Sequence, residues 1–323
     1  MMPSAASPAL FVDLQPDSGS FLGDVLKGLA QSPKALSPKY FYDARGSQLF
    51  EAICELPEYY PTRTEMTLMR ECAGEIASLL DQDGLLIEFG SGASVKTEIL
   101  LQTMRPRAYV PVDISADALR GSVSRLNTAF PGLPVIAVCA DYMQPMQVTE
   151  LARYESCRRS IYFPGSTIGN LTPEEARSFL GRARGLAGAG GSMIVGVDLK
   201  KDPAVLHAAY NDAQGVTAEF NLNLLRRINH ELAADFDLQQ FCHIAFYNET
   251  AGRIEMHLES LKSQQVSVSG KNFTFDAGER MHTENSYKYT VEEFRALARD
   301  AGFVPGQVWV DAKSFFAVHL LRA

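Results

Sequence analysis

The stretch Leu85–Leu101, LLIEFGSGASVKTEILL, limits the possible folds of this chain more than any other segment. A short apolar run leads into two glycines separated by one residue, and an amphipathic segment follows. This order is typical of a buried strand, a tight turn and a helix. Such a unit opens a doubly wound α/β sheet, in which ligands bind at the carboxyl ends of the strands.

Gly90 and Gly92 in this turn indicate an adenosine-containing ligand. Glycine tolerates positive φ and lets a ligand approach the backbone, while the following helix offers free N–H groups. A dinucleotide fingerprint needs a third glycine where this chain has Val95, so NAD and FAD are disfavoured. A tight turn in an α/β protein that binds no nucleotide is the alternative interpretation of this stretch.

Acidic residues stand at the ends of three successive predicted strands. They are Glu88, Asp113 and Asp141. An acid at the end of the second strand is typical of ribose binding, which we expect of Asp113. Asp141 can accept a hydrogen bond from an adenine amino group, and Tyr142 can supply an apolar face. Each acid taken alone is more often a helix cap or a solvated loop residue.

Strands and helices alternate through the middle of the chain and predict a parallel sheet. Near the C-terminus, two further strands separated by a short polar turn predict an antiparallel hairpin that closes the sheet. The predicted strands after the first are Ala108–Val112, Val135–Val138, Ser160–Phe163, Ser192–Asp198, Gln307–Val310 and Phe315–Leu321.

The pattern changes after the fifth strand. A mainly helical stretch, Pro203–Ala234, is followed by two predicted hairpins, which argue for a second, smaller α+β domain that covers the site. We expect residues 61–200 and 286–323 to form the larger domain and residues 21–60 and 201–285 the smaller one. Residues 1–20 are rich in Ser, Pro and Ala and predict a loosely ordered arm.

The composition excludes several classes of protein. The 323 residues include 30 Lys+Arg and 38 Asp+Glu, and no basic cluster suggests nucleic acid or an acidic membrane as a partner. There is no apolar run of membrane-spanning length and no signal-peptide pattern, so we expect a cytoplasmic protein. We also expect a monomer. The five cysteines lack a CxxC pair and the six histidines are scattered, so we expect neither a disulfide framework nor a metal.

Two segments outside the glycine turn suggest a binding site. In Leu56–Glu65, LPEYYPTRTE, Tyr59 and Tyr60 lie between two prolines, so the tyrosines are held rigidly. They either line a pocket or anchor a loop to the core. We expect the helix after them to begin at Thr64. Gly165–Asn170 precedes a capping box and therefore predicts a loop at the carboxyl edge of the sheet.

Six motifs together resemble a known family, the S-adenosylmethionine-dependent histidine Nα-methyltransferases of ergothioneine biosynthesis. They are PKYFYDARGS, LPEYYPTRTE, EFGSGASVKT, FPGSTIGNLTP, DLKKDPAVLHAAYNDAQGVTAEFN and MHTENSYKY. The resemblance implies a Rossmann-like class I methyltransferase sheet. It also implies that three methyl groups pass from S-adenosylmethionine to the α-amino group of L-histidine, giving the betaine hercynine, a precursor of ergothioneine.

The resemblance implies roles for particular residues toward the cofactor. The turn at Gly90 and Gly92, together with Lys96 and Asp113, would hold its methionine end and ribose. Asp141 and Tyr142 match the adenine site of the family.

The resemblance also implies the residues that bind the substrate. Asn170 and Tyr210 match positions that grip the α-carboxylate and orient the amine, and Tyr42 matches a tyrosine near the amine. We expect Tyr42 and Asn170 to act as catalytic residues. The residues that match the pocket around the imidazole are Tyr59, Met256, Glu284 and Ser286. Glu284 and Ser286 would point the same way on an extended segment and could contact the two ring nitrogens.

Two other functions are kept as alternatives. The chain could methylate another amino acid or a small amine, or it could be a binding protein that uses the cofactor as a sensor ligand. An NAD-dependent oxidoreductase is disfavoured by Val95.

Overall fold

A computed structural model describes residues 9–14, 20–92 and 95–323 of the chain, and these residues form two compact units. The first unit holds residues 9–14, 61–92, 95–199 and 289–323. The second holds residues 20–60 and 200–288. None of the helices in the described ranges is both long and apolar enough to cross a membrane.

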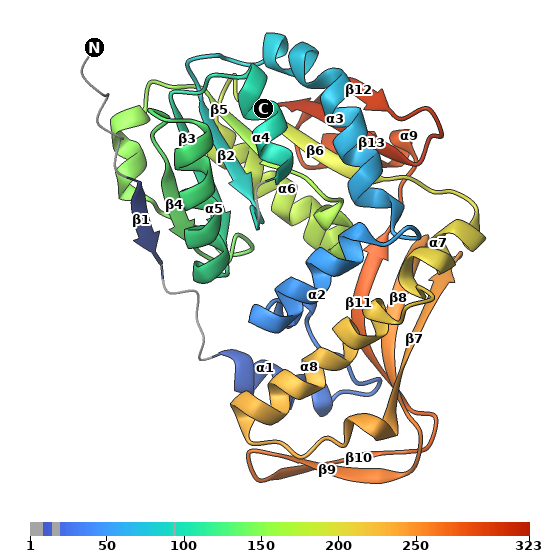
Figure 1. The fold of residues 1–323 in the computed structure, drawn as a ribbon. Helices are drawn as coiled ribbons and strands as arrows, with labels where there is room; N and C mark the ends of the chain where they lie inside the picture. The colour runs from blue at the N-terminus through green and yellow to red at the C-terminus, as the bar shows by residue number, and fades with distance from the viewer. Residues whose placement is uncertain (1–8, 15–19, 93–94) are drawn as a thin grey trace. The chain divides into compact units, whose positions relative to one another are not determined.

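Within the described residues, the first unit contains an eight-stranded sheet with the order β1-β4-β3-β2-β5-β6-β13-β12 (Figure 1). All neighbouring strands are parallel except the pairs that β13 makes with β6 and β12. The predicted doubly wound sheet with a terminal antiparallel hairpin is therefore confirmed. Its strands are β1 Leu10–Asp13, β2 Leu85–Phe89, β3 Ala108–Asp113, β4 Ile136–Cys139, β5 Arg159–Phe163, β6 Ser192–Asp198, β12 Val304–Val310 and β13 Phe316–Arg322.

Alternate side chains of β2 face opposite layers of helices. Glu88 faces α4, where it accepts a hydrogen bond from Thr97, while the ring of Phe89 lies 5.7 Å from that of Phe179 on α6. Because the strand is buried on both faces, it reads as a continuous apolar run with one acid in it. The helices that include residues of this unit are α3 Tyr60–Leu79, α4 Val95–Thr103, α5 Ala116–Ala129, α6 Pro173–Ala187 and α9 Val291–Asp300, with short 3-10 helices at η2 Thr149–Tyr154 and η3 Thr167–Asn170.

The second unit combines helices with two antiparallel sheets. One sheet has the order β11-β8-β7 and the other pairs β10 with β9. The hairpins β7–β8 and β9–β10 are as predicted, whereas the pairing of β11 with β8 was not predicted. Helix α8 contacts β7, β8 and α2 (Figure 1). The elements are α1 Ser20–Leu29, η1 Pro38–Phe41, α2 Ala44–Glu55, α7 Pro203–Tyr210, α8 Val216–Leu232, η4 Leu238–Gln240, β7 Phe241–Asn248, β8 Arg253–Ser260, β9 Gln264–Val268, β10 Lys271–Phe275 and β11 Arg280–Tyr287.

The expectation of a loosely ordered arm is wrong for Leu10–Asp13. These four residues form β1, which pairs in parallel with β4 at the edge of the sheet (dark blue in Figure 1). The cause is tertiary, because an edge strand of four residues acquires its conformation from the neighbour whose backbone groups it satisfies. The rest of the predicted arm, residues 1–8 and 15–19, lies outside the described residues.

Two other boundaries differ from those predicted. Helix α3 begins at Tyr60 rather than Thr64, because Pro61 falls in its first turn, where the missing N–H costs nothing. Ser286 and Tyr287 pair with Ile254 and Arg253 of β8, so they belong to the second unit and not to the larger one.

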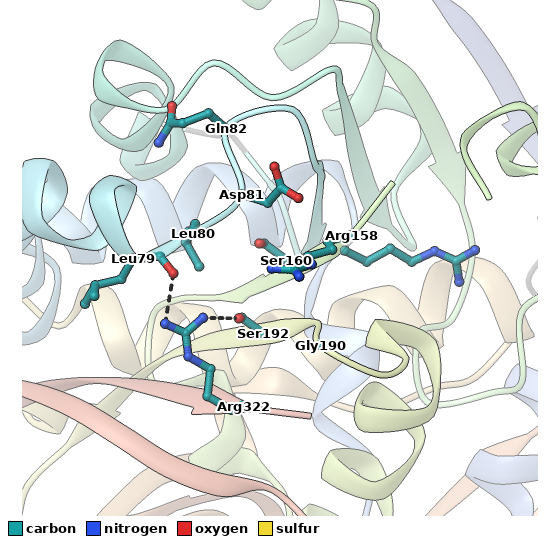
Figure 2. A pocket seen from close by; sticks show the side chains of 10 residues that line it. Leu79, Leu80, Asp81, Gln82, Arg158, Ser160, Gly190, Ser192 and Arg322 are labelled. Carbon is teal, nitrogen blue, oxygen red and sulfur yellow. Dashed lines mark hydrogen bonds between the residues drawn. The ribbon is translucent and has the colours of Figure 1, made fainter. Parts of the chain in front are cut away.

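A cavity of about 320 Å³ lies at the edge where β5 and β6 begin, opposite the Gly90 turn. Figure 2 shows Arg322 donating hydrogen bonds to the carbonyl of Leu79, at 2.9 Å, and to Ser192 Oγ, at 2.8 Å. Arg159 likewise donates to the carbonyl of Leu186 at 3.0 Å. These guanidinium groups satisfy carbonyls in the last turns of α3 and α6. Arg322 and Arg159 therefore have a structural role at this cavity.

Candidate functional site

The glycine turn is held by the strand next to it. Gly90 has φ +66° and its N–H donates to the carbonyl of Val112 at 2.8 Å, while Gly92 has φ +45°. Asp113 Oδ2 accepts the N–H of Gly92 at 2.9 Å, and its Oδ1 accepts the N–H of Ser115 at 2.9 Å. Because β2 and β3 are in parallel register, with Phe89 opposite Val112, their carboxyl ends meet at one edge of the sheet.

Asp113 therefore holds the Gly90 turn in place. The sequence predicts that Asp113 and this turn bind the same ligand. Burial raises the pKa of its carboxyl, and the backbone donors of Ser115 and Gly92 act against this effect. Each carboxylate oxygen retains a lone pair after accepting one backbone hydrogen. The expected bond to a ribose hydroxyl is compatible with this geometry and stays a prediction.

Tyr142 lies against an aromatic cluster beside the turn. Its ring centroid is 5.7 Å from that of Phe89, 5.6 Å from Phe163 and 5.9 Å from Phe179. Burial raises the pKa of the Tyr142 phenol well above its usual range, so the ring is a neutral apolar surface. Asp141 is half-buried and accepts the N–H of Met143 at 2.9 Å. The two residues lie at the same edge of the sheet as Asp113, as an adenine site would require.

Glu65 on α3 is a residue of this region that the sequence reasoning missed. It is fully buried, both its carboxylate oxygens lie 2.9 Å from the N–H of Gly165, and it forms an ion pair with Lys96. A Cβ at position 196 of β6 would lie 2.1 Å from Glu65 Oε1, so a larger residue there would displace the carboxylate from its position. Gly196 inside an apolar strand was the available signal that another group approaches the backbone closely.

Lys96 is thus already paired with Glu65. An ammonium group has three hydrogens, so it can donate to a second carboxylate while it keeps the first. Its predicted contact with the methionine carboxylate of the cofactor stays a prediction, and Glu65 fixes where the ammonium lies.

The loop that carries Asn170 is ordered by the same carboxylate. Glu65 holds the loop at Gly165, and Ser166, with φ +56°, accepts the N–H of Asp198 on its Oγ at 2.9 Å. A single turn of 3-10 helix then ends at Asn170, whose side chain is half-buried. The predicted loop therefore has a defined conformation. Glu65 pairs with Lys96 and also holds, at Gly165, the loop that carries Asn170.

Glu88, the first of the three acids, is a structural group. It is 1% exposed and accepts hydrogen bonds from Thr97 Oγ1, at 2.5 Å, and from the Tyr109 hydroxyl. Burial raises its pKa to about 7, and the hydrogen bonds from Thr97 and Tyr109 oppose that rise. Its hydrogen-bond donors are buried core side chains, and Lys96 and Asp113 act on it only through their charges, so we assign Glu88 a structural role.

This buried acid predicts a dependence of stability on pH. A carboxyl whose folded pKa lies above its unfolded value of 4.5 binds more protons in the native state, so its contribution is present below pH 4.5 and is lost as pH rises through about 7. The difference in free energy of unfolding between Glu88→Gln and the wild type should therefore increase by up to about 3 kcal/mol, in favour of the variant, when the pH is raised from 5 to 8. Urea unfolding at both pH values measures this gain. Glu71→Gln, at an exposed site, is the control, and an equal gain in both variants would contradict the prediction.

In the second unit, Tyr42, Tyr59 and Tyr210 belong to one aromatic group. Tyr42 and Phe50 have ring centroids 5.7 Å apart, Phe50 and Tyr59 6.3 Å, and Tyr59 and Tyr210 6.3 Å. Burial raises the pKa of the Tyr59 phenol well above its usual range, and the nearby Tyr210 adds to the effect. The three predicted tyrosines therefore lie together, although they come from three separate segments of the chain.

Tyr42 is positioned by the N-terminus of α2. Asp43 caps that helix by accepting the N–H of Gly46 at 2.6 Å and also accepts a hydrogen bond from Asn223 at 2.9 Å. A Cβ on Gly46 would lie 1.7 Å from the carbonyl oxygen of Phe41, so only glycine fits there. The motif YDARG thus fixes the backbone next to Tyr42.

Met256, Glu284 and Ser286 lie on the central and edge strands of the three-stranded sheet. Glu284 pairs with Met256 of β8, and Ser286 with Ile254, without a register shift between them, so Glu284 and Ser286 share a face as predicted. All three are buried, and Glu284 is also an electrostatic neighbour of Tyr59. Burial raises the pKa of Glu284 to about 7, against the opposing charge of Lys288.

Lys288 is a second residue that the sequence reasoning missed. It is 2% exposed, and its Nζ donates to Ser286 Oγ at 2.8 Å and to the Tyr210 hydroxyl at 3.2 Å. The Tyr210 hydroxyl donates to Ser286 Oγ at 2.8 Å. The sequence did contain a signal, because Glu284, Ser286 and Lys288 are spaced two residues apart, as expected for side chains on one face of an extended segment. Of the predicted substrate residues, Asn170 belongs to the first unit and the other six positions belong to the second.

Comparison with known proteins identifies the family. Residues 21–323 match the model of the S-adenosylmethionine-dependent, histidine-specific methyltransferases. The chain belongs to this family. It is 43% identical to a histidine N-alpha-methyltransferase of Mycobacterium tuberculosis over 92% of this chain and 93% of the relative. It is 42% identical to one of Mycolicibacterium smegmatis over the same shares. Ergothioneine biosynthesis protein 1 of Neurospora crassa is 28% identical over 90% of this chain and 33% of its own length.

Membership of this methyltransferase family makes the protein an enzyme whose cofactor is S-adenosylmethionine, and the residues of the first unit fit that cofactor. Apart from its chain neighbours, no described atom lies within 4 Å of where a Cβ on Gly92 would be, so there is space beside the turn. Asp113 can accept from a ribose, and Asp141 with Tyr142 can contact adenine. Among the described residues, no group of His, Cys, Asp and Glu could hold a metal ion.

Proposed function

We propose that this methyltransferase transfers methyl groups from S-adenosylmethionine to the α-amino nitrogen of L-histidine, three times, to give hercynine, a precursor of ergothioneine. The observation that carries the proposal is the buried pair Glu284 and Ser286 on one face of β11. A carboxylate and a hydroxyl side by side match the two nitrogens of an imidazole. If the substrate had an aliphatic or phenyl side chain instead, the buried carboxylate and hydroxyl would be left without hydrogen-bond partners, which is unfavourable.

The aromatic group of the second unit suits the rest of the substrate. We propose that Asn170 binds the α-carboxylate through its amide, without a full countercharge. The hydrogen of the Tyr210 hydroxyl goes to Ser286 Oγ, so Tyr210 is proposed to position the substrate through its ring. Tyr42 and Tyr59 offer ring faces toward which a methylated ammonium is attracted by cation–π interaction. This interaction tolerates added methyl groups, as three successive transfers require.

The chemical step needs positioning more than acid or base catalysis. The cofactor supplies an electrophilic methyl group on a sulfonium, and the positive charge leaves the sulfur as the methyl group is transferred. The amine must be neutral, and an α-amino group with a pKa of about 8 is mostly protonated at neutral pH. Solvent is proposed to take that proton, either directly or through the Tyr42 hydroxyl, which would release its own proton to solvent as it accepts the one from the amine. The enzyme's contribution is then to hold the amine in line with the methyl group.

Mass spectrometry of the product tests the proposal. Enzyme, S-adenosylmethionine and L-histidine should yield a product heavier than histidine by three methylene units, with mono- and dimethylated species as intermediates. A panel of the other amino acids and small amines, at equal concentration, should give at least a hundredfold lower kcat/KM. Methylation of another amine in preference to histidine would favour the alternative acceptor and overturn the proposed one.

We also propose a monomer that works in the cytoplasm with no nucleic-acid or membrane partner, supported by the excess of acidic over basic residues. Light scattering coupled to gel filtration measures the oligomeric state, and a dimer mass would contradict the proposal.

A further inference from the structure

The second unit buries the ammonium group of Lys288 next to the hydroxyls of Ser286 and Tyr210. We propose that Lys288 is a positioning residue that makes Ser286 a hydrogen-bond donor toward the substrate ring, so that the pocket selects the neutral imidazole. This inference rests on the proposed function, because it assumes that Glu284 and Ser286 contact the imidazole.

Counting donors fixes the direction of the two hydrogen bonds from Lys288. An ammonium has three donors and no acceptor, so Ser286 Oγ and the Tyr210 oxygen can only accept from Lys288. The Tyr210 hydroxyl spends its single hydrogen on Ser286 Oγ, at 2.8 Å. Ser286 Oγ thus accepts twice within this triangle of groups. Its own hydrogen has no acceptor in the triangle and must be donated outside it.

Glu284 supplies the complementary group. It lies two residues before Ser286 on the same face, and an ionised carboxylate only accepts. The groups that act electrostatically with Glu284 are the Lys288 ammonium, which favours its charged form, and the Tyr59 phenol. The pocket therefore presents one acceptor and one donor. A neutral imidazole has one N–H and one lone pair, whereas an imidazolium has two N–H groups and an indole has no acceptor nitrogen.

A purely structural role for Lys288 predicts something different. If Lys288 only stabilises the sheet, for instance through its position 5.1 Å from the centre of the Tyr210 ring, its removal should lower stability and leave substrate recognition intact in the folded fraction. If it acts through Ser286, its effect on recognition should disappear once Ser286 has no hydroxyl.

A double-mutant cycle separates these cases. Lys288→Met keeps the chain length and removes the charge. It should raise KM for histidine about tenfold, with KM for S-adenosylmethionine changed by less than twofold. In a Ser286→Ala background, the same substitution should raise KM for histidine by less than threefold. Lys34→Met is the matched control. This lysine of the same unit is also largely buried, lies 4.7 Å from the centre of the Phe275 ring and pairs with Glu279. It should leave both KM values unchanged.

The pH profile gives a second readout. Loss of the Lys288 charge should move the acidic limb of kcat/KM for histidine to higher pH, because Glu284 then holds its proton more strongly. A folded Lys288→Met enzyme with an unchanged KM for histidine would overturn the inference. An equal rise of KM in both backgrounds would overturn it as well.

A measurement on the wild type tests the inference even if Lys288→Met does not fold. Nitrogen-15 NMR of ring-labelled histidine, bound with S-adenosylhomocysteine at pH 6, should show a neutral ring with one N–H, although half or more of free histidine is then protonated. A doubly protonated bound ring would refute it. Failure of the wild type to methylate histidine while it binds S-adenosylmethionine would overturn the proposed function together with the inference, whereas an active wild type with a protonated bound ring overturns the inference alone.

Discussion

Glu284→Ala is expected to lower kcat/KM for histidine by about 30- to 150-fold while the affinity for S-adenosylmethionine changes by less than twofold. The carboxylate is 8% exposed, and the bond that we propose it accepts from the imidazole N–H is charge-assisted and shielded from water. Such a bond contributes roughly 2–3 kcal/mol, and its loss leaves the ring nitrogen without a partner. Steady-state kinetics with each substrate varied in turn, and calorimetric binding of S-adenosylmethionine, give the two quantities.

A matched control for this prediction lies on the neighbouring strand. Glu255 of β8 is also 8% exposed, but it is paired with Arg253 and His257 and is not a predicted substrate residue. Glu255→Ala should reduce stability and change kcat/KM for histidine by less than threefold in the folded enzyme. Equal losses of histidine activity in the two variants would show that Glu284 acts through the stability of the sheet, against the prediction.

Glu65→Ala should both raise KM for S-adenosylmethionine and lower the stability of the first unit. The substitution leaves the N–H of Gly165 without its acceptor and the Lys96 ammonium without its carboxylate. Breaking a buried ion pair by removing one partner costs about 3 kcal/mol. We expect a loss of that size in the free energy of unfolding, and at least a tenfold rise in KM for S-adenosylmethionine, since Lys96 and the loop that carries Asn170 lose their common support.

Guanidinium unfolding and initial-rate kinetics measure the two effects, and Glu75→Ala is the control on the same helix. Glu75 is exposed and accepts the indole N–H of Trp309 at 2.8 Å. Its removal should cost about 1 kcal/mol and leave KM for the cofactor unchanged. If Glu65→Ala lowered stability but left KM for S-adenosylmethionine at the wild-type value, Glu65 would have no part in shaping the cofactor site.

Most of the sheet could be predicted because its strands are strongly apolar. β2 is buried at all five positions, and the glycine turn after it is required by positive φ at Gly90 and Gly92. The capping boxes at Thr172 and Thr290 mark the starts of α6 and α9. Local chemistry is sufficient in these places, because the residues that decide the conformation are neighbours in the chain.

Leu10–Asp13 could not be predicted for the opposite reason. Four residues near a Pro- and Ser-rich terminus carry too little periodic signal, and only the pairing of Leu10 with Ile136 makes them a strand. The start of α2 at Ala44 also depends on a distant residue, since Asp43 acts as a cap that is itself held by Asn223.

The sequence by itself determined the doubly wound sheet, the glycine turn, the acids at the strand ends and, through its motifs, the family. Those features depend on residues close together in the chain or on the common direction of parallel strands, which brings Asp113 to the Gly90 turn. Only the tertiary structure revealed the two buried groups that organise the site. Glu65 meets Gly165 across 100 positions and Lys288 meets Tyr210 across 78. Gly196 inside an apolar strand and the even spacing of Glu284, Ser286 and Lys288 hint at such groups but do not name their partners, because a buried charge is stable only where folding has already placed its partner.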